Sequence, residues 1–105
     1  MVKLSIIIPA YNEKETIREI IKQVSDIKIP KEIILIDDCS TDGTREILQT
    51  EYSHLKNIKV LLHKKNRGKG AAIRTGLKDI EGDIIIIQDA DLEYDPQDYP
   101  KLIKP

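Results

Sequence analysis

The chain has 105 residues, with 17 Lys and Arg against 18 Asp and Glu, which gives a formal net charge of −1. This size excludes a multidomain assembly, and this charge does not favour binding to nucleic acid or membrane through bulk electrostatics. The hydrophobic content of 40% is too high for a disordered chain. The single cysteine excludes an intrachain disulfide, and no apolar run approaches the roughly 20 residues that span a bilayer. We therefore expect a cytoplasmic domain with an aliphatic core.

Four short apolar runs predict β-strands, and the segments between them have helical periodicity. The runs are residues 4–8, 33–36, 58–62 and 84–87. Most contain consecutive β-branched residues without polar alternation, which is typical of strands covered on both faces by helices. The first helix has an apolar stripe of Ile17, Ile20, Ile21 and Val24, and the second a weaker one of Ile47, Leu48 and Tyr52. The third has a small-residue face that would allow close packing on a sheet, formed by Ala71, Ala72, Thr75 and Gly76.

Capping residues agree with these helices. Asn12 precedes acidic residues and predicts the start of the first helix. Asp42, with the glycine that follows it, predicts a turn and a cap before the second. Asp95 and Pro96 predict a last short helix that runs toward Leu102 and Ile103.

The resulting order is β-α-β-α-β-α-β-α, and this alternation predicts an α/β fold with a mostly parallel sheet and helices on both faces. Such sheets bind ligands beyond the carboxyl ends of their strands. The residues that follow the predicted strands are therefore the candidate site. They are residues 9–13, 37–40, 66–70 and 88–91.

The sequence Asp89-Ala90-Asp91 follows the last strand. In an extended backbone the two carboxylates face the same side, and like charges so close together favour a shared cation. Carboxylate oxygens suit Mg2+ or Mn2+, and Glu93 could add a third ligand. The alternative is a turn or cap before the next helix.

Two further segments have both a functional and a structural interpretation. Of Asp37 and Asp38, one should point inward and the other outward. A carboxylate at this position could accept a hydrogen bond from a nucleobase or a ribose, and the alternative is that it anchors the loop. Residues 66–70 open the third helix, where main-chain N–H groups with Arg67 and Lys69 suit a diphosphate, although a solvated basic turn would look the same. Near the first strand, Glu13 could contact a ligand or serve only as a first-turn acid.

Together, these motifs resemble family 2 glycosyltransferases, and most closely the dolichyl-phosphate or polyprenyl-phosphate mannose synthase branch. The resemblance covers essentially the whole chain. It rests on four segments in order: SIIIPAYNE (5–13), IDDCSTDGT (36–44), NRGKG (66–70) and DADLEYDP (89–96).

The resemblance implies the GT-A fold and a nucleotide-diphosphate sugar donor, GDP-mannose or a UDP-sugar, with Mg2+ or Mn2+ as the metal. It implies metal ligands at Asp89, Asp91 and Glu93. The nucleotide site combines residues that match the family with Lys69, which we add on electrostatic grounds: Pro9, Tyr11, Glu13, Ile36, Asp38, Lys69, Asp89 and Ala90.

The resemblance also implies that residues 1–105 are a single nucleotide-sugar-binding domain, truncated at its C-terminus. The acceptor site and the general base are expected downstream of Pro105, so no catalytic residue is assigned within the chain. The full enzyme would transfer the sugar to a polyprenyl phosphate at the cytoplasmic membrane face, whereas this chain would bind donor and metal with little transfer.

The same truncation would leave the fourth strand, 84–87, as an open edge, which predicts a homodimer through it. Two other hypotheses for the function are a non-enzymatic nucleotide- or metal-binding half-domain and an unrelated α/β domain with an acidic pocket.

Overall fold

The computed structural model describes residues 2–90. Strands and helices alternate along this part of the chain, as the sequence predicts. The elements are β1 (Leu4–Ala10), α1 (Ile17–Ser25), β2 (Lys31–Asp37), α2 (Thr44–Ile47), the π-helical segment η1 (Leu48–Tyr52), β3 (Ile58–Leu62), α3 (Lys69–Leu77) and β4 (Ile84–Ile87). The last helix expected from Asp95 and Pro96 lies outside the described residues.

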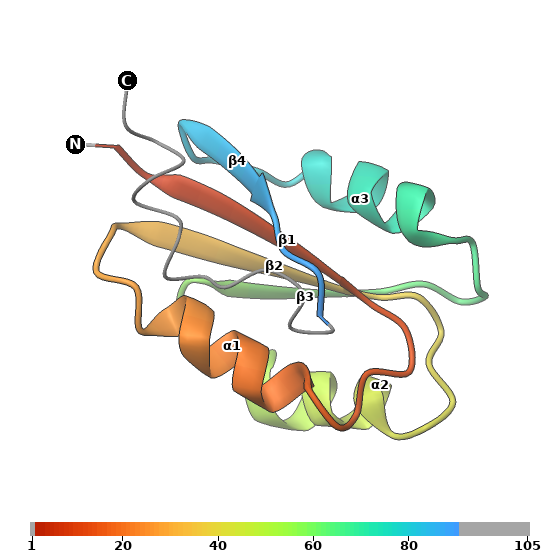
Figure 1. Ribbon diagram of the computed structural model, residues 1–105. Helices are drawn as coiled ribbons and strands as arrows, with labels where there is room; N and C mark the ends of the chain where they lie inside the picture. Colours follow the sequence, from red (N-terminus) through yellow and green to blue (C-terminus); the bar gives the residue numbers. More distant parts are fainter. Residues whose placement is uncertain (1, 91–105) are drawn as a thin grey trace.

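The four strands form one parallel sheet in the order β3-β2-β1-β4. The register pairs Ile6 of β1 with Ile33 of β2 on one side and with Ile86 of β4 on the other. Because the strands are parallel, their carboxyl ends all lie at one edge of the sheet (Figure 1). The predicted α/β class and the parallel sheet are confirmed.

Helices cover both faces of this sheet. On one face, α1 and α2 pack against the alternate β1 residues Leu4, Ile6 and Ile8. On the other face, α3 packs through Ala72 against Ile7, Ile34 and Ile36 (Figure 1). The small residues of α3 allow this close approach: a Cβ on Gly76 would lie 2.9 Å from Ile36 Cδ1.

The start of α1 differs from the prediction. The helix begins at Ile17 with Thr16 as its N-cap, whereas Asn12 has a φ of 53° in the turn after β1. Asparagine tolerates this left-handed conformation better than most residues. Its side-chain Oδ1 accepts the Thr41 main-chain N–H at 2.7 Å, so it joins two loops instead of capping a helix.

The turn predicted before the second helix is present, with Gly43 as the N-cap residue of α2 and Asp42 directly before it. Asp42 Oδ1 accepts hydrogen bonds from the Thr44 main-chain N–H at 3.0 Å and from its hydroxyl at 2.6 Å. Gly43 between them has a φ of 108°, a conformation that favours glycine.

The two central strands and β4 differ in burial. Every residue of β1 is buried, and all but the first of β2 are. In β4, by contrast, Ile84 and Ile86 are half-buried and Ile85 and Ile87 are 42% and 43% exposed. The expectation of coverage on both faces is therefore wrong for β4 within residues 2–90, because α3 lies over the centre of the sheet. No helix in this part of the chain is long and apolar enough to cross a membrane.

Candidate nucleotide-binding site

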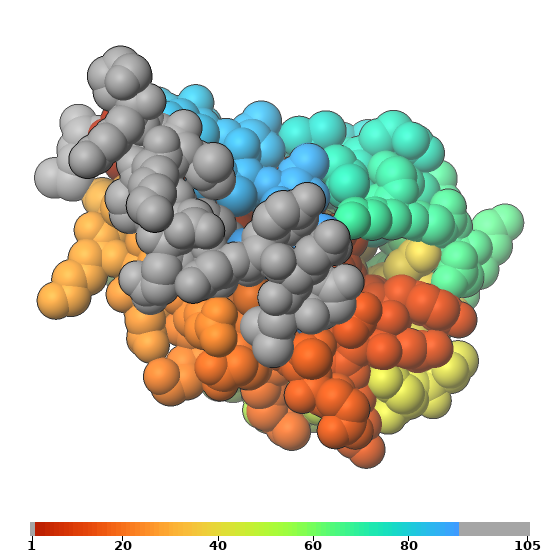
Figure 2. Space-filling view, viewed as in Figure 1, coloured from red at the N-terminus to blue at the C-terminus, as the bar shows by residue number. Residues whose placement is uncertain are grey.

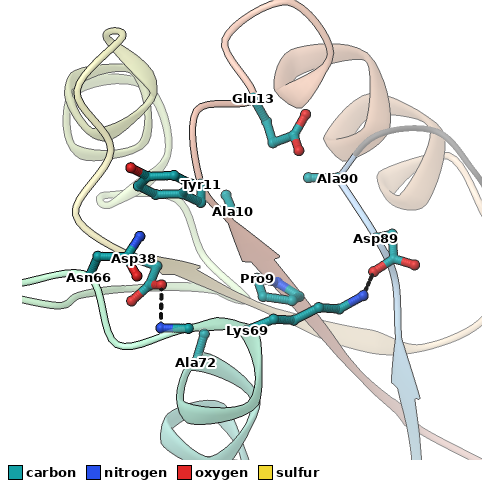
Figure 3. A pocket seen from close by; sticks show the side chains of 11 residues that line it. Pro9, Ala10, Tyr11, Glu13, Asp38, Asn66, Lys69, Ala72, Asp89 and Ala90 are labelled. Carbon is teal, nitrogen blue, oxygen red and sulfur yellow. Dashed lines mark hydrogen bonds and ion pairs between the residues drawn. The ribbon is translucent and has the colours of Figure 1, made fainter.

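A pocket of about 420 Å³ lies at the carboxyl ends of the strands. The surface is hollowed here between α3 and the loop that follows β1 (Figure 2). The loops after β1, β2, β3 and β4 all contribute to its walls (Figure 3). The lining residues are Pro9, Ala10, Tyr11, Glu13, Asp38, Asn66, Gly68, Lys69, Ala72, Asp89 and Ala90.

The adjacent carboxylates Asp37 and Asp38 have separate roles. Asp37 is fully buried, and its Oδ2 accepts the Ser40 main-chain N–H at 3.1 Å and lies 3.3 Å from Arg45 Nη1. It therefore anchors the loop after β2. Asp38 lines the pocket instead. The anchoring interpretation is confirmed for Asp37, and acceptance of a hydrogen bond from a ligand by Asp38 stays a prediction.

The Asp38 carboxylate is held by groups of the fold. Its Oδ1 lies 2.8 Å from His63 Nδ1 and accepts the Arg67 main-chain N–H at 2.9 Å, and its Oδ2 accepts the Gly68 main-chain N–H at 2.8 Å. Burial raises the pKa of Asp38, but these hydrogen bonds outweigh it and leave the pKa below its ordinary value. Asp38 is therefore ionised near neutral pH, and His63 Nδ1 is the donor to it.

The glycine-containing loop before α3 behaves differently from the expected diphosphate cradle. The Arg67 and Gly68 N–H groups donate to the Asp38 carboxylate and so are not available to a diphosphate. Gly68 has a φ of 94°, which orients its N–H toward the carboxylate. Arg67 does not line the pocket, whereas the Lys69 ammonium does and pairs with Asp89 Oδ1. Of the two predicted cations, only Lys69 lies at the site.

The acidic end of the pocket combines residues that follow β4 with residues that precede α1. Asp89 and Ala90 line it together with Glu13 (Figure 3). The Thr16 hydroxyl lies 2.5 Å from the Ala90 carbonyl oxygen and 3.3 Å from Glu13 Oε2, so it ties the two segments together. Within residues 2–90 no group of three His, Cys, Asp or Glu could hold a metal.

The predicted metal site is thus described only in part, since Asp91 and Glu93 lie outside the described residues. Asp89 supplies one carboxylate at the pocket wall, and carboxylate oxygen is the ligand type that Mg2+ and Mn2+ prefer. The described residue therefore fits a hard divalent cation.

The predicted position of the general base also lies outside the described residues. It is expected downstream of Pro105, and Pro105 itself is beyond the range 2–90 that the structure describes. This expectation therefore stays a prediction, and the pocket residues are assigned to binding and not to proton transfer.

Among the predicted nucleotide contacts, Ile36 is the exception. Its side chain is fully buried in the cluster under α3, and it does not line the pocket. Pro9, Tyr11, Glu13, Asp38, Lys69, Asp89 and Ala90 all do. Tyr11 is 46% exposed, and an aromatic ring at a pocket wall is suited to contact a planar group.

Two residues of the site carried no expected role. His63 directly follows β3 and is buried, and its Nε2 lies 2.8 Å from Thr75 Oγ1. Asn66 was included only as part of the basic loop, and its side chain lines the pocket beside Asp38 (Figure 3). Both residues follow β3, and this position, at the same sheet edge as Asp38, was the sequence feature that could have indicated their place at the site.

The loops after β1 and β2 are joined by side-chain to main-chain hydrogen bonds. The main-chain N–H groups of residues 12, 13 and 14 donate to Ser40 Oγ, Thr44 Oγ1 and Asp42 Oδ2, at distances of 3.0, 3.0 and 3.1 Å. Together with the bond from Asn12 to Thr41, these contacts form what we call the loop clasp. The clasp fixes the wall of the pocket that carries Tyr11 and Glu13.

A parallel sheet with a pocket of acidic and basic residues at its carboxyl edge is the arrangement in which α/β folds bind ligands. Residues 5–105 match the model of the family described as Glycosyl transferase family 2, and the chain belongs to this family.

The chain is also similar to curated proteins and to solved structures. It is 38% identical over 104 residues to the dolichol-phosphate mannosyltransferase of Pyrococcus furiosus, covering 97% of this chain and 29% of the relative. It resembles S. aureus TarS 1–349 in complex with UDP, with 33% identity, a TM-score of 0.75 and coverage of 85% and 27% of the two chains. It also resembles the mannosyltransferase PcManGT from Pyrobaculum calidifontis in complex with GDP-Man and Mn2+, with 30% identity, a TM-score of 0.76 and coverage of 84% and 27%. The chain therefore spans less than a third of each of these proteins.

Proposed function

We propose that the pocket binds the nucleotide-diphosphate part of a sugar donor, GDP-mannose or a UDP-sugar, for transfer of the sugar to a polyprenyl phosphate. One observation carries this proposal: an aromatic ring and a hydrogen-bond acceptor lie at one end of the pocket, and an ammonium group and a carboxylate that can bind a metal lie at the other. Tyr11 and Asp38 form the first end, and Lys69 and Asp89 form the second (Figure 3). Names of similar proteins support the donor and acceptor classes.

The divalent cation belongs to the diphosphate end. Asp89 would hold it, and Asp91 and Glu93, which the resemblance implies as ligands, would complete the site. Such a cation neutralises the charge that develops on a leaving diphosphate. A similar structure contains Mn2+; Mg2+ has the same preference for oxygen ligands, and we propose that either supports binding.

The chain's own residues would position the donor and screen its charge. The Lys69 ammonium, at the start of α3, lies where it can approach diphosphate oxygens. Asp38 would accept a hydrogen bond from the nucleobase, and Tyr11 would stack on it. The general base for the acceptor is expected downstream of Pro105, and none of residues 2–90 is assigned this role. We therefore propose that this chain by itself binds donor and metal and transfers little sugar.

Calorimetric titration of UDP and GDP, with and without Mn2+, tests the proposal. We expect binding of at least one nucleotide, strengthened by Mn2+, and a marked loss in Asp89→Asn and Lys69→Met. The matched control is Lys78→Met, which removes an exposed lysine at the opposite end of the same helix. Absence of binding by both nucleotides, or equal losses in the two lysine variants, would refute the assignment.

A second candidate function is a non-enzymatic nucleotide- or metal-binding half-domain. It is favoured by the pocket residues, which within residues 2–90 supply groups for binding and none that we assign to proton transfer. Sugar transfer to a polyprenyl phosphate separates the two functions. Turnover supports the enzyme, and nucleotide binding without turnover by any longer form of the protein supports the binding module.

We also propose a homodimer through β4. Within residues 2–90, β4 pairs with β1 on one side only, and its Ile85 and Ile87 side chains are exposed. Apolar edge strands favour pairing with another chain. Sedimentation should show a dimer that Ile85→Lys dissociates; a 12 kDa monomer at high concentration would remove the idea. For location we propose the cytoplasm, at the membrane face for a longer form, which cell fractionation tests.

A further inference from the structure

The number of hydrogen bonds that Asp38 can still accept is limited. A carboxylate has two oxygens with about four lone-pair positions in all. Oδ1 faces two donors, His63 Nδ1–H and the Arg67 main-chain N–H, and Oδ2 takes one, the Gly68 main-chain N–H. Oδ1 is therefore filled, and Oδ2 keeps a single position for a ligand in the pocket that Asp38 lines.

The three donors to Asp38 are held in place, so the carboxylate cannot turn freely to offer a second position. Two of them are main-chain groups at the start of α3. The third, His63, is only 6% exposed, and its Nε2 lies 2.8 Å from Thr75 Oγ1 in the middle of the same helix. The imidazole is thus fixed between the end of β3 and α3, and it fixes Asp38 in turn.

The surroundings of this acceptor have a defined chemistry. The Asn66 side chain lies beside Asp38, and Tyr11 lies next to both, whereas Lys69 extends toward Asp89 at the other end (Figure 3). An asparagine amide supplies two N–H donors. A ligand at this end of the pocket therefore meets one acceptor position on Asp38 with an amide donor at its side.

We propose that this site selects a base with a single ring N–H flanked by carbonyl groups, namely uracil or thymine, over guanine, and that His63 is the positioning residue that sets this selectivity. This inference rests on the proposed function. Uracil offers one N–H, which the free position on Oδ2 can accept, and a neighbouring carbonyl oxygen, which the Asn66 amide can satisfy. Guanine offers a ring N–H and an adjacent amino group, which together need two acceptors.

Guanine would have to displace His63 or Arg67 from Oδ1, or leave its amino group without a partner in the pocket. Sites built around specific hydrogen bonds discriminate strongly against ligands that leave polar groups unpaired. The nucleobase preference is therefore decided by a histidine that lies behind Asp38 and is not among the pocket-lining residues.

The test compares the dissociation constants of UDP, dTDP and GDP for the 105-residue chain in the presence of Mn2+. We expect UDP and dTDP to bind at least about tenfold more tightly than GDP, which corresponds to about 1.4 kcal/mol. If GDP binds as tightly or more tightly, the inference is overturned and the proposed function stands. If no nucleotide binds, both fail.

Three variants test the role of His63. His63→Phe removes the donor to Oδ1 and frees a second acceptor position, so the preference for UDP over GDP should fall toward one. His63→Gln, whose amide can still donate, should retain the preference. The control Thr75→Val removes the other hydrogen bond of the same imidazole and should also retain it. An unchanged preference in a folded His63→Phe protein overturns this role; if that variant does not fold, the comparison of nucleotides in the unmodified chain still decides the selectivity.

Discussion

Replacing Gly76 with alanine measures how closely α3 is packed on the sheet. The added Cβ would lie 2.9 Å from Ile36 Cδ1 and 3.0 Å from Ile7 Cγ2, and both isoleucines are fully buried, so neither can move aside. Overpacking of this kind costs about 1–3 kcal/mol. Alanine gains up to about 1 kcal/mol in helix propensity. We therefore expect a net loss of roughly 0–2 kcal/mol in the free energy of unfolding.

The matched control is Gly70→Ala in the same helix. A Cβ there meets only Arg74 Nη1, at 3.4 Å, so the propensity gain is not opposed by the core. Urea unfolding of both variants should place Gly76→Ala about 1–3 kcal/mol below Gly70→Ala, with similar dependence on urea. Equal stability of the two variants would refute the close contact between α3 and the sheet.

Three further predictions concern the stability of the fold. A Cβ at Gly82 would lie 2.5 Å from Ser5 Oγ, so Gly82→Ala should lower the free energy of unfolding by about 1–3 kcal/mol, measured in urea; an unchanged midpoint contradicts this. Asp42→Ala removes the hydrogen bonds to Thr44 and should cost about 0.5–2 kcal/mol, visible as a lower Tm. Burial raises the pKa of Glu32, but hydrogen bonds from Ser5 and a main-chain N–H, with a nearby lysine, hold it below its ordinary 4.5, so the stabilising charge is complete above that pH and lost as the pH falls below it. Unfolding between about pH 3 and pH 6 should then depend less steeply on pH in Glu32→Gln, and an equal slope would contradict the argument.

The parts of the fold that the sequence predicts are those set by local patterns. The strand at 84–87 follows from a continuous apolar run, and the buried stripe of α1, from Ile17 to Val24, follows from helical periodicity. The division of roles between Asp37 and Asp38 follows from alternation along a strand. The pocket at the carboxyl edge follows from the parallel connection of the strands.

Contacts between distant segments account for what the sequence did not predict. Asparagine is a common helix-capping residue, but the Asn12 side chain accepts a hydrogen bond from Thr41, 29 residues away. The N–H groups before α3 looked available to an anion because nothing local indicates that Asp38, about 30 residues earlier, accepts them. His63 was missed for the same reason. The pairing of Asp89 with Asp91 on one metal stays a prediction.

The loop clasp bears on how new specificities could be built on this scaffold. The main chain after β1 is held by side chains of the segment from Ser40 to Thr44, so neither segment keeps its shape when the other is exchanged. A chimera that takes only one of these segments from a relative would lose the hydrogen bonds that join it to the other segment. Recombination between family members should therefore succeed only when both segments are transplanted together.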